Sequence, residues 1–205
     1  MPFQICYITD RHALEPAPLP PRIQEAVRAG VDLVQIREKD LETRALVELV
    51  KEGLESARGS QSRIVVNDRL DIALALGVDG VHLSTLSIPA KAVRAHVPAN
   101  FLIGVSCHTL EEALDAESAG ASYAVFGPVF ETPSKLRYGP PLGLEKLREV
   151  AAQVRIPILA LGGITVGRVK ACLGAGAAGI AGIRIFQDCK SIEGRVRELR
   201  AQFAR

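Results

Sequence analysis

The chain has no close pair of cysteines and no long hydrophobic run, and these absences exclude several classes of protein. Its four cysteines are far apart, so neither a zinc ribbon nor a CxxC redox motif is present; they are Cys6, Cys107, Cys172 and Cys189. We interpret them as reduced thiols of a cytosolic protein. No basic start precedes an apolar signal core, and no apolar stretch approaches the roughly 20 residues of a membrane span. The sequence therefore predicts a cytoplasmic protein with no membrane partner.

The sequence also lacks the excess of basic residues that is typical of nucleic-acid-binding proteins. The 25 basic and 23 acidic residues leave a net charge of +2, and no basic stripe is interleaved with aromatic residues, which make up 4% of the chain. We expect no nucleic-acid partner, while a homo-oligomer stays open. A hydrophobic content of 48% with 23% charged residues is ordinary for a globular protein. Because nothing marks a linker in the 205 residues, we expect a single domain over residues 1–205.

One pattern that is present occurs four times: a glycine followed within a few residues by a short apolar run. Each glycine suits the left-handed residue that ends a helix, and each run predicts a buried strand. The glycines are Gly30, Gly77, Gly120 and Gly176. Helices and buried strands that alternate in this way are typical of a parallel sheet.

Eight strand-like runs alternate with helical patterns along the whole chain. They lie near residues 4–9, 32–37, 63–67, 80–84, 101–106, 123–127, 157–161 and 179–184. This order predicts a compact (β/α)8 barrel, whose active site lies at the carboxyl ends of its strands. An open doubly wound sheet is the alternative, but the GxGxxG turn typical of that fold is absent. The irregular segment 130–143 follows the sixth strand and is expected to cover the mouth of the barrel.

The end of the second strand carries two cations and an amide. Gln35, Arg37 and Lys39 alternate with other residues, so they face the same way. This group suits a polyanion such as diphosphate, because arginine binds two oxygens at once and lysine adds a mobile charge. The alternative is a solvated strand end whose cations pair with Glu38 or Asp40.

The ends of strands three and five add an acid and further polar groups. Asn67 and Asp68 could hold Mg²⁺, which takes one or two carboxylates together with substrate phosphates; alternatively, they form a turn or a helix cap. Ser106 could donate to a phosphate oxygen, and His108 could either shuttle a proton or fill the turn before a helix capped by Thr109.

The later strand ends predict a second anion site. Thr132, Ser134 and Lys135 form a plausible clamp in the loop after strand six. Two glycines after strand seven lead toward a helix, where backbone N–H groups bind phosphate. Barrels often place a phosphate site between the loops of strands seven and eight. The residues expected there are Gly162, Gly163, Gly182, Ile183 and Arg184.

Seven ordered segments resemble the thiamine phosphate synthase/TenI family. They are QIREK, VND, DGVHLS, GVSCHT, FGPVFETPSK, LALGGIT and GIAGIRIF. The resemblance implies a (β/α)8 barrel in thiamine biosynthesis. Synthase members join a hydroxymethylpyrimidine diphosphate to a thiazole phosphate and release diphosphate, whereas TenI-type members include thiazole tautomerases.

The resemblance also implies roles for individual residues. Asp68 would bind Mg²⁺. The thiazole phosphate would lie near Thr132, Ser134, Gly163, Ile183 and Arg184. The pyrimidine diphosphate would be bound by Gln35, Arg37, Lys39, Asn67, Ser106 and Lys135.

Three positions depart from the family pattern. Ser87 stands where synthases have a second acidic metal ligand, and Pro128 stands where a characterised tautomerase has its histidine. Arg184 replaces a usual serine in the phosphate turn. The loop after strand six favours a synthase. A tautomerase with His108 as proton shuttle, or a barrel that binds thiamine precursors without catalysis, are the alternatives.

Overall fold

The eight strands form a ring of neighbours. The computed structural model describes residues 5–14, 16–132 and 140–203. Within these residues, parallel strands pair in sequence order, and β1 pairs with both β2 and β8, so the sheet closes into a barrel. The expected (β/α)8 barrel is confirmed, and the open sheet is wrong. The strands are β1 (Ile5–Ile8), β2 (Leu33–Ile36), β3 (Arg63–Asn67), β4 (Gly80–Leu83), β5 (Leu102–Cys107), β6 (Tyr123–Phe126), β7 (Ile158–Ala160) and β8 (Gly179–Gly182).

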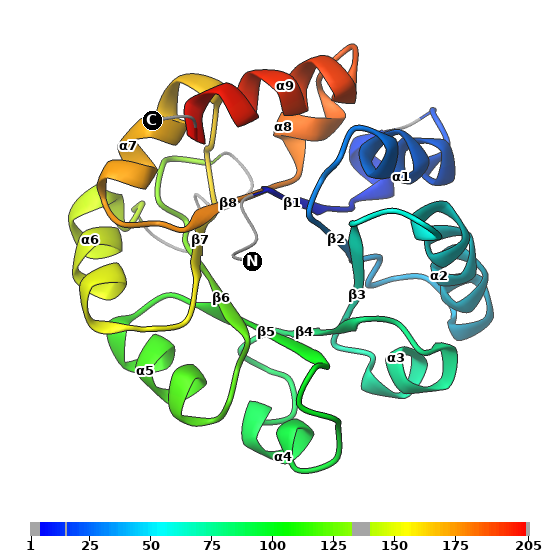
Figure 1. Cartoon of the computed structure of the whole chain (residues 1–205), viewed down its shortest axis with the longest axis horizontal. Helices are drawn as coiled ribbons and strands as arrows, with labels where there is room; N and C mark the ends of the chain where they lie inside the picture. The colour runs from blue at the N-terminus through cyan, green and yellow to red at the C-terminus, as the bar shows by residue number, and fades with distance from the viewer. Residues whose placement is uncertain (1–4, 15, 133–139, 204–205) are drawn as a thin grey trace.

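Helices lie outside this ring and cover its outer face (Figure 1). The last of them packs against both α7 and α1, which closes the outer layer. Among the described residues the helices are α1 (Leu19–Arg28), α2 (Thr43–Ala57), α3 (Leu70–Leu76), α4 (Ala90–Arg94), α5 (Leu110–Ser118), α6 (Gly143–Gln153), α7 (Val166–Gly174), α8 (Arg184–Gln187) and α9 (Ile192–Phe203), with a short 3₁₀ turn η1 (Arg11–Ala13). No helix in this part of the chain is long and apolar enough to cross a membrane.

The four repeated glycines occupy the left-handed conformation that the sequence predicts. Their φ angles are +80° at Gly30, +66° at Gly77, +80° at Gly120 and +93° at Gly176. Each glycine follows a helix and precedes the next strand, so the chain reverses direction without strain on a β-carbon. The repeated unit is therefore one helix, one left-handed glycine and one strand.

Side chains alternate between the inside of the barrel and the layer beneath the helices. In β1, Cys6 and Ile8 belong to the inner cluster, while Ile5 and Tyr7 belong to the outer core. The other members of the inner cluster are Leu33, Val65, Tyr123, Val125, Leu159 and Ala181. The two-residue period of a strand fixes which later residues face inward at the strand ends. These inward rows determine the residues of the site.

Candidate active site

Toward the carboxyl ends of the strands, the inward rows change from apolar to polar. Gln35 continues the row of Leu33, and Asn67 continues that of Val65. Gln35 Nε2 donates a 2.9 Å hydrogen bond to Asn67 Oδ1, and Asn67 Nδ2 donates a 2.8 Å bond to Asp68 Oδ2. A chain of amides therefore connects the interior of the barrel to Asp68.

Gln35 leaves one polar atom unsatisfied. Its side-chain oxygen Oε1 is buried and has no hydrogen-bond partner among the described residues. A buried acceptor without a donor costs about 1–3 kcal/mol. Because Gln35 also lines a cavity, a donor group on a ligand would recover this energy.

The first cavity, of about 400 Å³, opens above this polar layer. It brings together residues from β2, β3 and β5 that the sequence assigns to the diphosphate site. They are Gln35, Arg37, Lys39, Asn67 and Ser106, and His108, which the sequence offers as a proton shuttle, lies in the same cavity. Ser84 and Thr85, which follow β4, also line it. Both cations therefore lie at one cavity.

The neighbouring acids do not neutralise these cations. Glu38 and Asp40 pair instead with Arg11, at 3.2 Å and 2.5 Å. Hydrogen bonds from Arg11 and then His12 lower the pKa of the Asp40 carboxyl below its ordinary value. Among the described residues, neither Arg37 nor Lys39 has an ion pair. The alternative in which Glu38 or Asp40 pairs with these cations is therefore wrong.

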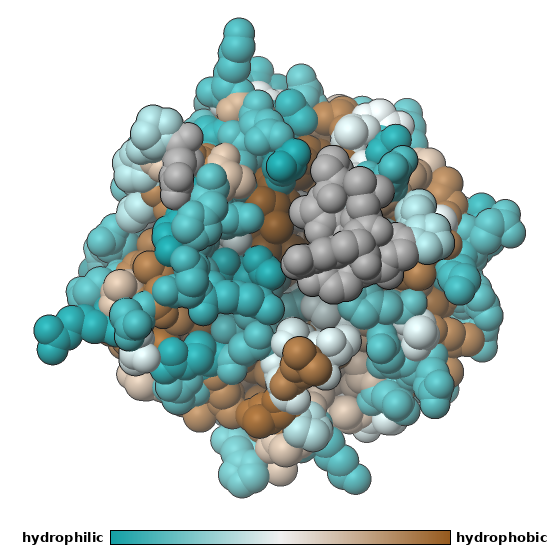
Figure 2. All heavy atoms as spheres, turned by 180° about the vertical axis from the view of Figure 1, so that it is seen from behind, coloured by the Kyte–Doolittle hydropathy of each residue, from teal (hydrophilic) through white to brown (hydrophobic). Residues whose placement is uncertain are grey.

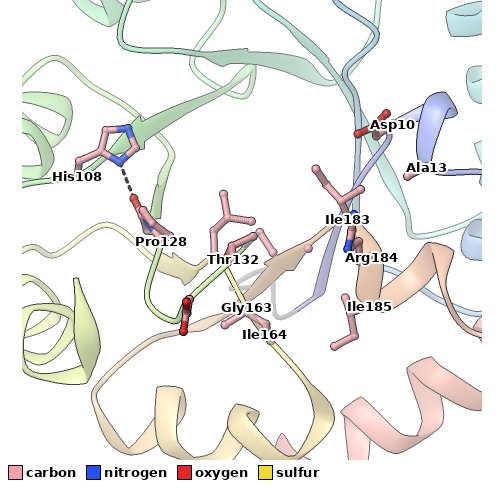
Figure 3. A pocket seen from close by; sticks show the side chains of 16 residues that line it. Asp10, Ala13, His108, Pro128, Thr132, Gly163, Ile164, Ile183, Arg184 and Ile185 are labelled. Carbon is pink, nitrogen blue, oxygen red and sulfur yellow. Dashed lines mark hydrogen bonds between the residues drawn. The ribbon is translucent and has the colours of Figure 1, made fainter. Parts of the chain in front are cut away.

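A second cavity, of about 270 Å³, is drawn in Figure 3 and shares lining residues with the first. It is lined by the predicted residues Thr132, Gly162, Gly163, Gly182, Ile183 and Arg184. Both cavities share Asp10, His108, Gly127, Leu161 and Ile183. Ile164 and Ile185 give the second cavity an apolar side (Figure 3). Figure 2 shows the end of the barrel opposite to that in Figure 1, with a hydrophobic hollow among hydrophilic side chains.

The glycine pair after β7 adopts a conformation and a packing that favour glycine. Gly162 and Gly163 have φ angles of +96° and +61°. A β-carbon on Gly163 would lie 2.6 Å from the carbonyl oxygen of Glu131. Phe130 N donates a 3.1 Å bond to Gly162 O, which joins this turn to the loop after β6. The loops of strands six and seven therefore form one wall.

Arg168 of α7 reinforces this wall. Its guanidinium lies 4.6 Å from the centre of the Phe130 ring, and its Nη1 donates a 2.7 Å bond to Gly163 O. The amides of Gly163 and Ile164 donate to no other described residue. Because these N–H groups precede α7, they are suited to a phosphate group.

Asp68 receives hydrogen bonds from the turn after β4. The backbone amide of Ser84 donates to Oδ1 at 2.8 Å, and the Ser84 hydroxyl donates to Oδ2 at 3.2 Å. The Ser87 hydroxyl also donates to Oδ1. The backbone of Asp68 is left-handed, with φ of +59°, which aspartate tolerates better than most residues. The residue before α3 is Arg69, whose side chain makes no capping bond, so the helix-cap alternative for Asp68 is wrong.

These contacts keep Asp68 ionised. Burial raises the pKa of its carboxyl. The hydrogen bonds from Ser87 and Ser84, together with the charge of Lys39, lower the pKa by more than burial raises it, so the net shift is downward. In the described part of the chain, no three His, Cys, Asp or Glu side chains gather to hold a metal ion. Asp68 and the two hydroxyls nevertheless form an all-oxygen set of the kind that fits Mg²⁺.

The two histidines at β4 and β5 differ in environment. His82 is buried, and its Nε2 lies 2.9 Å from Ser106 Oγ while its Nδ1 lies 3.2 Å from Tyr123 Oη. Burial lowers the pKa of His82 from 6.5 to about 4, so its ring is neutral at neutral pH. Its hydrogen bonds satisfy both ring nitrogens, as expected for a histidine in the wall of the barrel.

His108 lies at the junction of the two cavities, and its position is fixed locally. Its Nδ1 lies 2.5 Å from the carbonyl oxygen of Gly127, so Nδ1 carries the donated proton. Thr109 caps α5 by accepting a bond from Glu112 N, and Glu112 Oε2 accepts a bond from His108 N. The predicted cap at Thr109 is present, and the side chain of Glu112 accepts from the amide one residue before it. No carboxylate contacts the ring of His108 among the described residues.

Some residues of the site are not among those predicted from the sequence. Asp10 and Leu161 line both cavities, and Glu131 lines the second. The signal for Asp10 and Leu161 is the two-residue period, since they continue the inward rows of Ile8 and Leu159. The predicted residues Ser134 and Lys135 lie outside the described residues.

The barrel has two adjoining cavities at the carboxyl ends of its strands. Cations line one cavity, and the other lies beside a glycine turn. These features define the class of (β/α)8 barrels built to hold phosphorylated small molecules. A family match narrows this class. The chain belongs to the thiamine monophosphate synthase family, which matches residues 5–186.

Individual relatives cover nearly the whole chain. A thiamine-phosphate synthase of Roseiflexus sp. (strain RS-1) is 40% identical over 96% of this chain and 84% of its own length. One from Methanocella arvoryzae is 38% identical over 98% of this chain and 95% of its own. The solved thiamine phosphate pyrophosphorylase from Pyrococcus furiosus superposes with a TM-score of 0.87 at 34% identity, covering 98% of this chain and 95% of that one.

Proposed function

We propose that this protein joins hydroxymethylpyrimidine diphosphate to thiazole phosphate, forming thiamine phosphate and releasing diphosphate. The observation that carries the proposal is the pair of adjoining cavities, each with its own anion-binding groups. The relatives named thiamine-phosphate synthase support this reaction. Pro128, which cannot titrate, removes the histidine expected of a tautomerase.

The first cavity is assigned to the pyrimidine diphosphate. Arg37 and Lys39 supply positive charge for the diphosphate, and Ser106 supplies a hydroxyl. The unsatisfied Oε1 of Gln35 can accept from a donor on the pyrimidine ring. Lys135, outside the described residues, is expected to add a further cation from the loop after β6.

The second cavity is assigned to the thiazole phosphate. The free amides before α7 and the side chain of Arg184 bind its phosphate, while Ile164 and Ile185 contact the apolar parts of the ring. The two substrates then meet at the shared wall, where their reacting atoms are held side by side. Such positioning converts a reaction of two molecules into an effectively unimolecular step.

We also propose that Mg²⁺ is the cofactor and that Asp68 is its carboxylate ligand. When bound, the metal ion neutralises charge that grows on the departing diphosphate. The hydroxyls of Ser84 and Ser87 can rotate away from Asp68 to make room, whereas the Ser84 amide stays in place. Arg37 and Lys39 stabilise the same developing charge, which is larger in the transition state than in the bound substrate.

An assay with both purified precursors and Mg²⁺ tests the proposal. Thiamine phosphate, released diphosphate and thiazole isomerisation are followed separately. We expect thiamine phosphate and diphosphate in equal amounts. Isomerisation without coupling would indicate a tautomerase instead, and binding of both precursors without any product would indicate a barrel that binds without catalysis.

A further inference from the structure

Asp10 lies where the two cavities meet, and it belongs to neither of the proposed phosphate-binding groups. It follows β1 and continues the inward row of Cys6 and Ile8. Its side chain lines both cavities, and Figure 3 shows its carboxylate across the pocket from His108. Among the residues shared by the two cavities, Asp10 is the acidic one.

The carboxylate of Asp10 is not used to hold the fold together. Its oxygens make no hydrogen bond or ion pair with any described residue, in contrast to Glu38 and Asp40 nearby. The backbone of Asp10 is anchored instead, because its carbonyl oxygen accepts a 2.8 Å bond from Gln187 Nε2 and a 3.1 Å bond from Ala13 N. The residue is therefore fixed in place while its charge faces the cavities.

An unpaired carboxylate is a disadvantage in a site that binds two phosphorylated molecules. Like charges repel, so Asp10 weakens the binding of anions unless something positive lies beside it. Of these two cavities, Arg184 lines the second and not the first, whereas Arg37 and Lys39 line the first and not the second. The position of Asp10 at the junction therefore points to a positive charge that arises between the two substrates.

The proposed reaction creates such a charge at this point. The lone pair of the thiazole nitrogen forms a bond to the methylene carbon of the pyrimidine, as the bond between that carbon and the diphosphate oxygen breaks. The diphosphate leaves with the electron pair, and the ring nitrogen becomes a quaternary cation. No proton is gained or lost. Both the transition state and the product are more positive at this junction than the substrates.

We propose that Asp10 is a catalytic residue that stabilises the positive charge on the thiazolium ring as it forms. This inference rests on the proposed function. The carboxylate interacts more strongly with the positively charged transition state than with the neutral thiazole, and this difference accelerates the chemical step. Its repulsion of the anionic substrates lowers their affinity for the barrel.

The variant Asp10→Asn keeps the shape of the side chain and removes its charge. We expect kcat to fall by about 10- to 100-fold, as for the loss of one preorganised electrostatic group. The dissociation constant of thiamine phosphate should rise about tenfold, whereas that of inorganic diphosphate should stay equal or fall. Asp115→Asn, on the exposed face of α5, makes the same change of charge away from both cavities and should alter none of these values.

A loss of affinity for the cationic product without a loss of affinity for inorganic diphosphate distinguishes this role from a structural one. Equal kcat and equal affinity for thiamine phosphate in wild type and Asp10→Asn would overturn the inference and leave the proposed function standing. A wild-type protein that makes no thiamine phosphate would instead overturn the proposed function. Asp10→Ala provides a second variant; a large fall in melting temperature in both would show that the carboxylate serves the fold, which also overturns the inference.

Discussion

The hydroxyl group of Ser87 donates a hydrogen bond to the carboxylate of Asp68, across the gap between the β4 turn and the end of β3. The amide and hydroxyl of Ser84 donate to the same carboxylate. Hydrogen bonds from this turn therefore stabilise the negative charge of Asp68. Ser87 takes the position at which a second carboxylate would lie beside the first.

Ser87→Asp should make the protein depend on divalent cations for stability. The new carboxylate would face Asp68 directly, and two like charges so close raise each other's pKa and weaken the fold. We expect a lower melting temperature in EDTA, recovery in millimolar Mg²⁺, and half-maximal activity at a lower Mg²⁺ concentration than in wild type. Ser87→Ala is the control, since it loses the hydrogen bond and adds no charge. A melting temperature of Ser87→Asp that does not respond to Mg²⁺ would show that Asp68 is not a metal ligand.

Arg37→Ala should impair catalysis while leaving the fold intact. Arg37 has no ion pair among the described residues, so its removal leaves no acid unpaired. We expect kcat/KM to fall by about 10²- to 10³-fold and the affinity for inorganic diphosphate to decrease. Steady-state kinetics and calorimetry measure the two effects. Arg58→Ala, an exposed cation after α2, is the matched control; similar kinetics in both variants would contradict the assigned diphosphate site.

Gly163→Ala should destabilise the wall that the loops after β6 and β7 form together. The new methyl group would lie 2.6 Å from the carbonyl oxygen of Glu131, and the backbone has a φ of +61°. We expect the free energy of unfolding to fall by about 2 kcal/mol. Gly167 of α7 has no atom near its missing β-carbon, so Gly167→Ala should stabilise the helix by up to about 1 kcal/mol. Urea unfolding of both variants provides the comparison, and an equal stability of the two would refute the prediction.

His82 should make the protein less stable in acid. Its pKa is about 4 in the folded protein and 6.5 when unfolded, so between these values the unfolded state binds more protons. This contribution to stability is complete above pH 6.5 and is lost as the pH falls toward 4. It amounts to roughly 3 kcal/mol.

The slope of stability against pH isolates this effect from that of the carboxylates. Wild type should lose more unfolding free energy between pH 7 and pH 4 than His82→Gln does. His96→Gln removes an exposed histidine after α4 and should behave as wild type. A wild-type slope that matches that of His82→Gln would show that His82 titrates normally.

Most of the fold could be predicted because its signals are local. The left-handed glycines, the apolar runs of the strands and the cap of Thr109 each depend on a few neighbouring residues. Helix α1 gives a weaker local signal because it begins within a proline-rich segment. Its prolines occupy the first turn, where the missing N–H group costs no helical hydrogen bond.

The chain by itself determined the order of the barrel and the residues that line its mouth, since a two-residue period decides which side chains face inward. Only the tertiary structure decided how the acids are used. Glu38 and Asp40 form ion pairs with Arg11. Asp68 accepts hydrogen bonds from Ser84 and Ser87, and the carboxylate of Asp10 faces the cavities. These choices depend on contacts between different strand ends, which become neighbours only when the barrel closes, so no local pattern in the sequence records them.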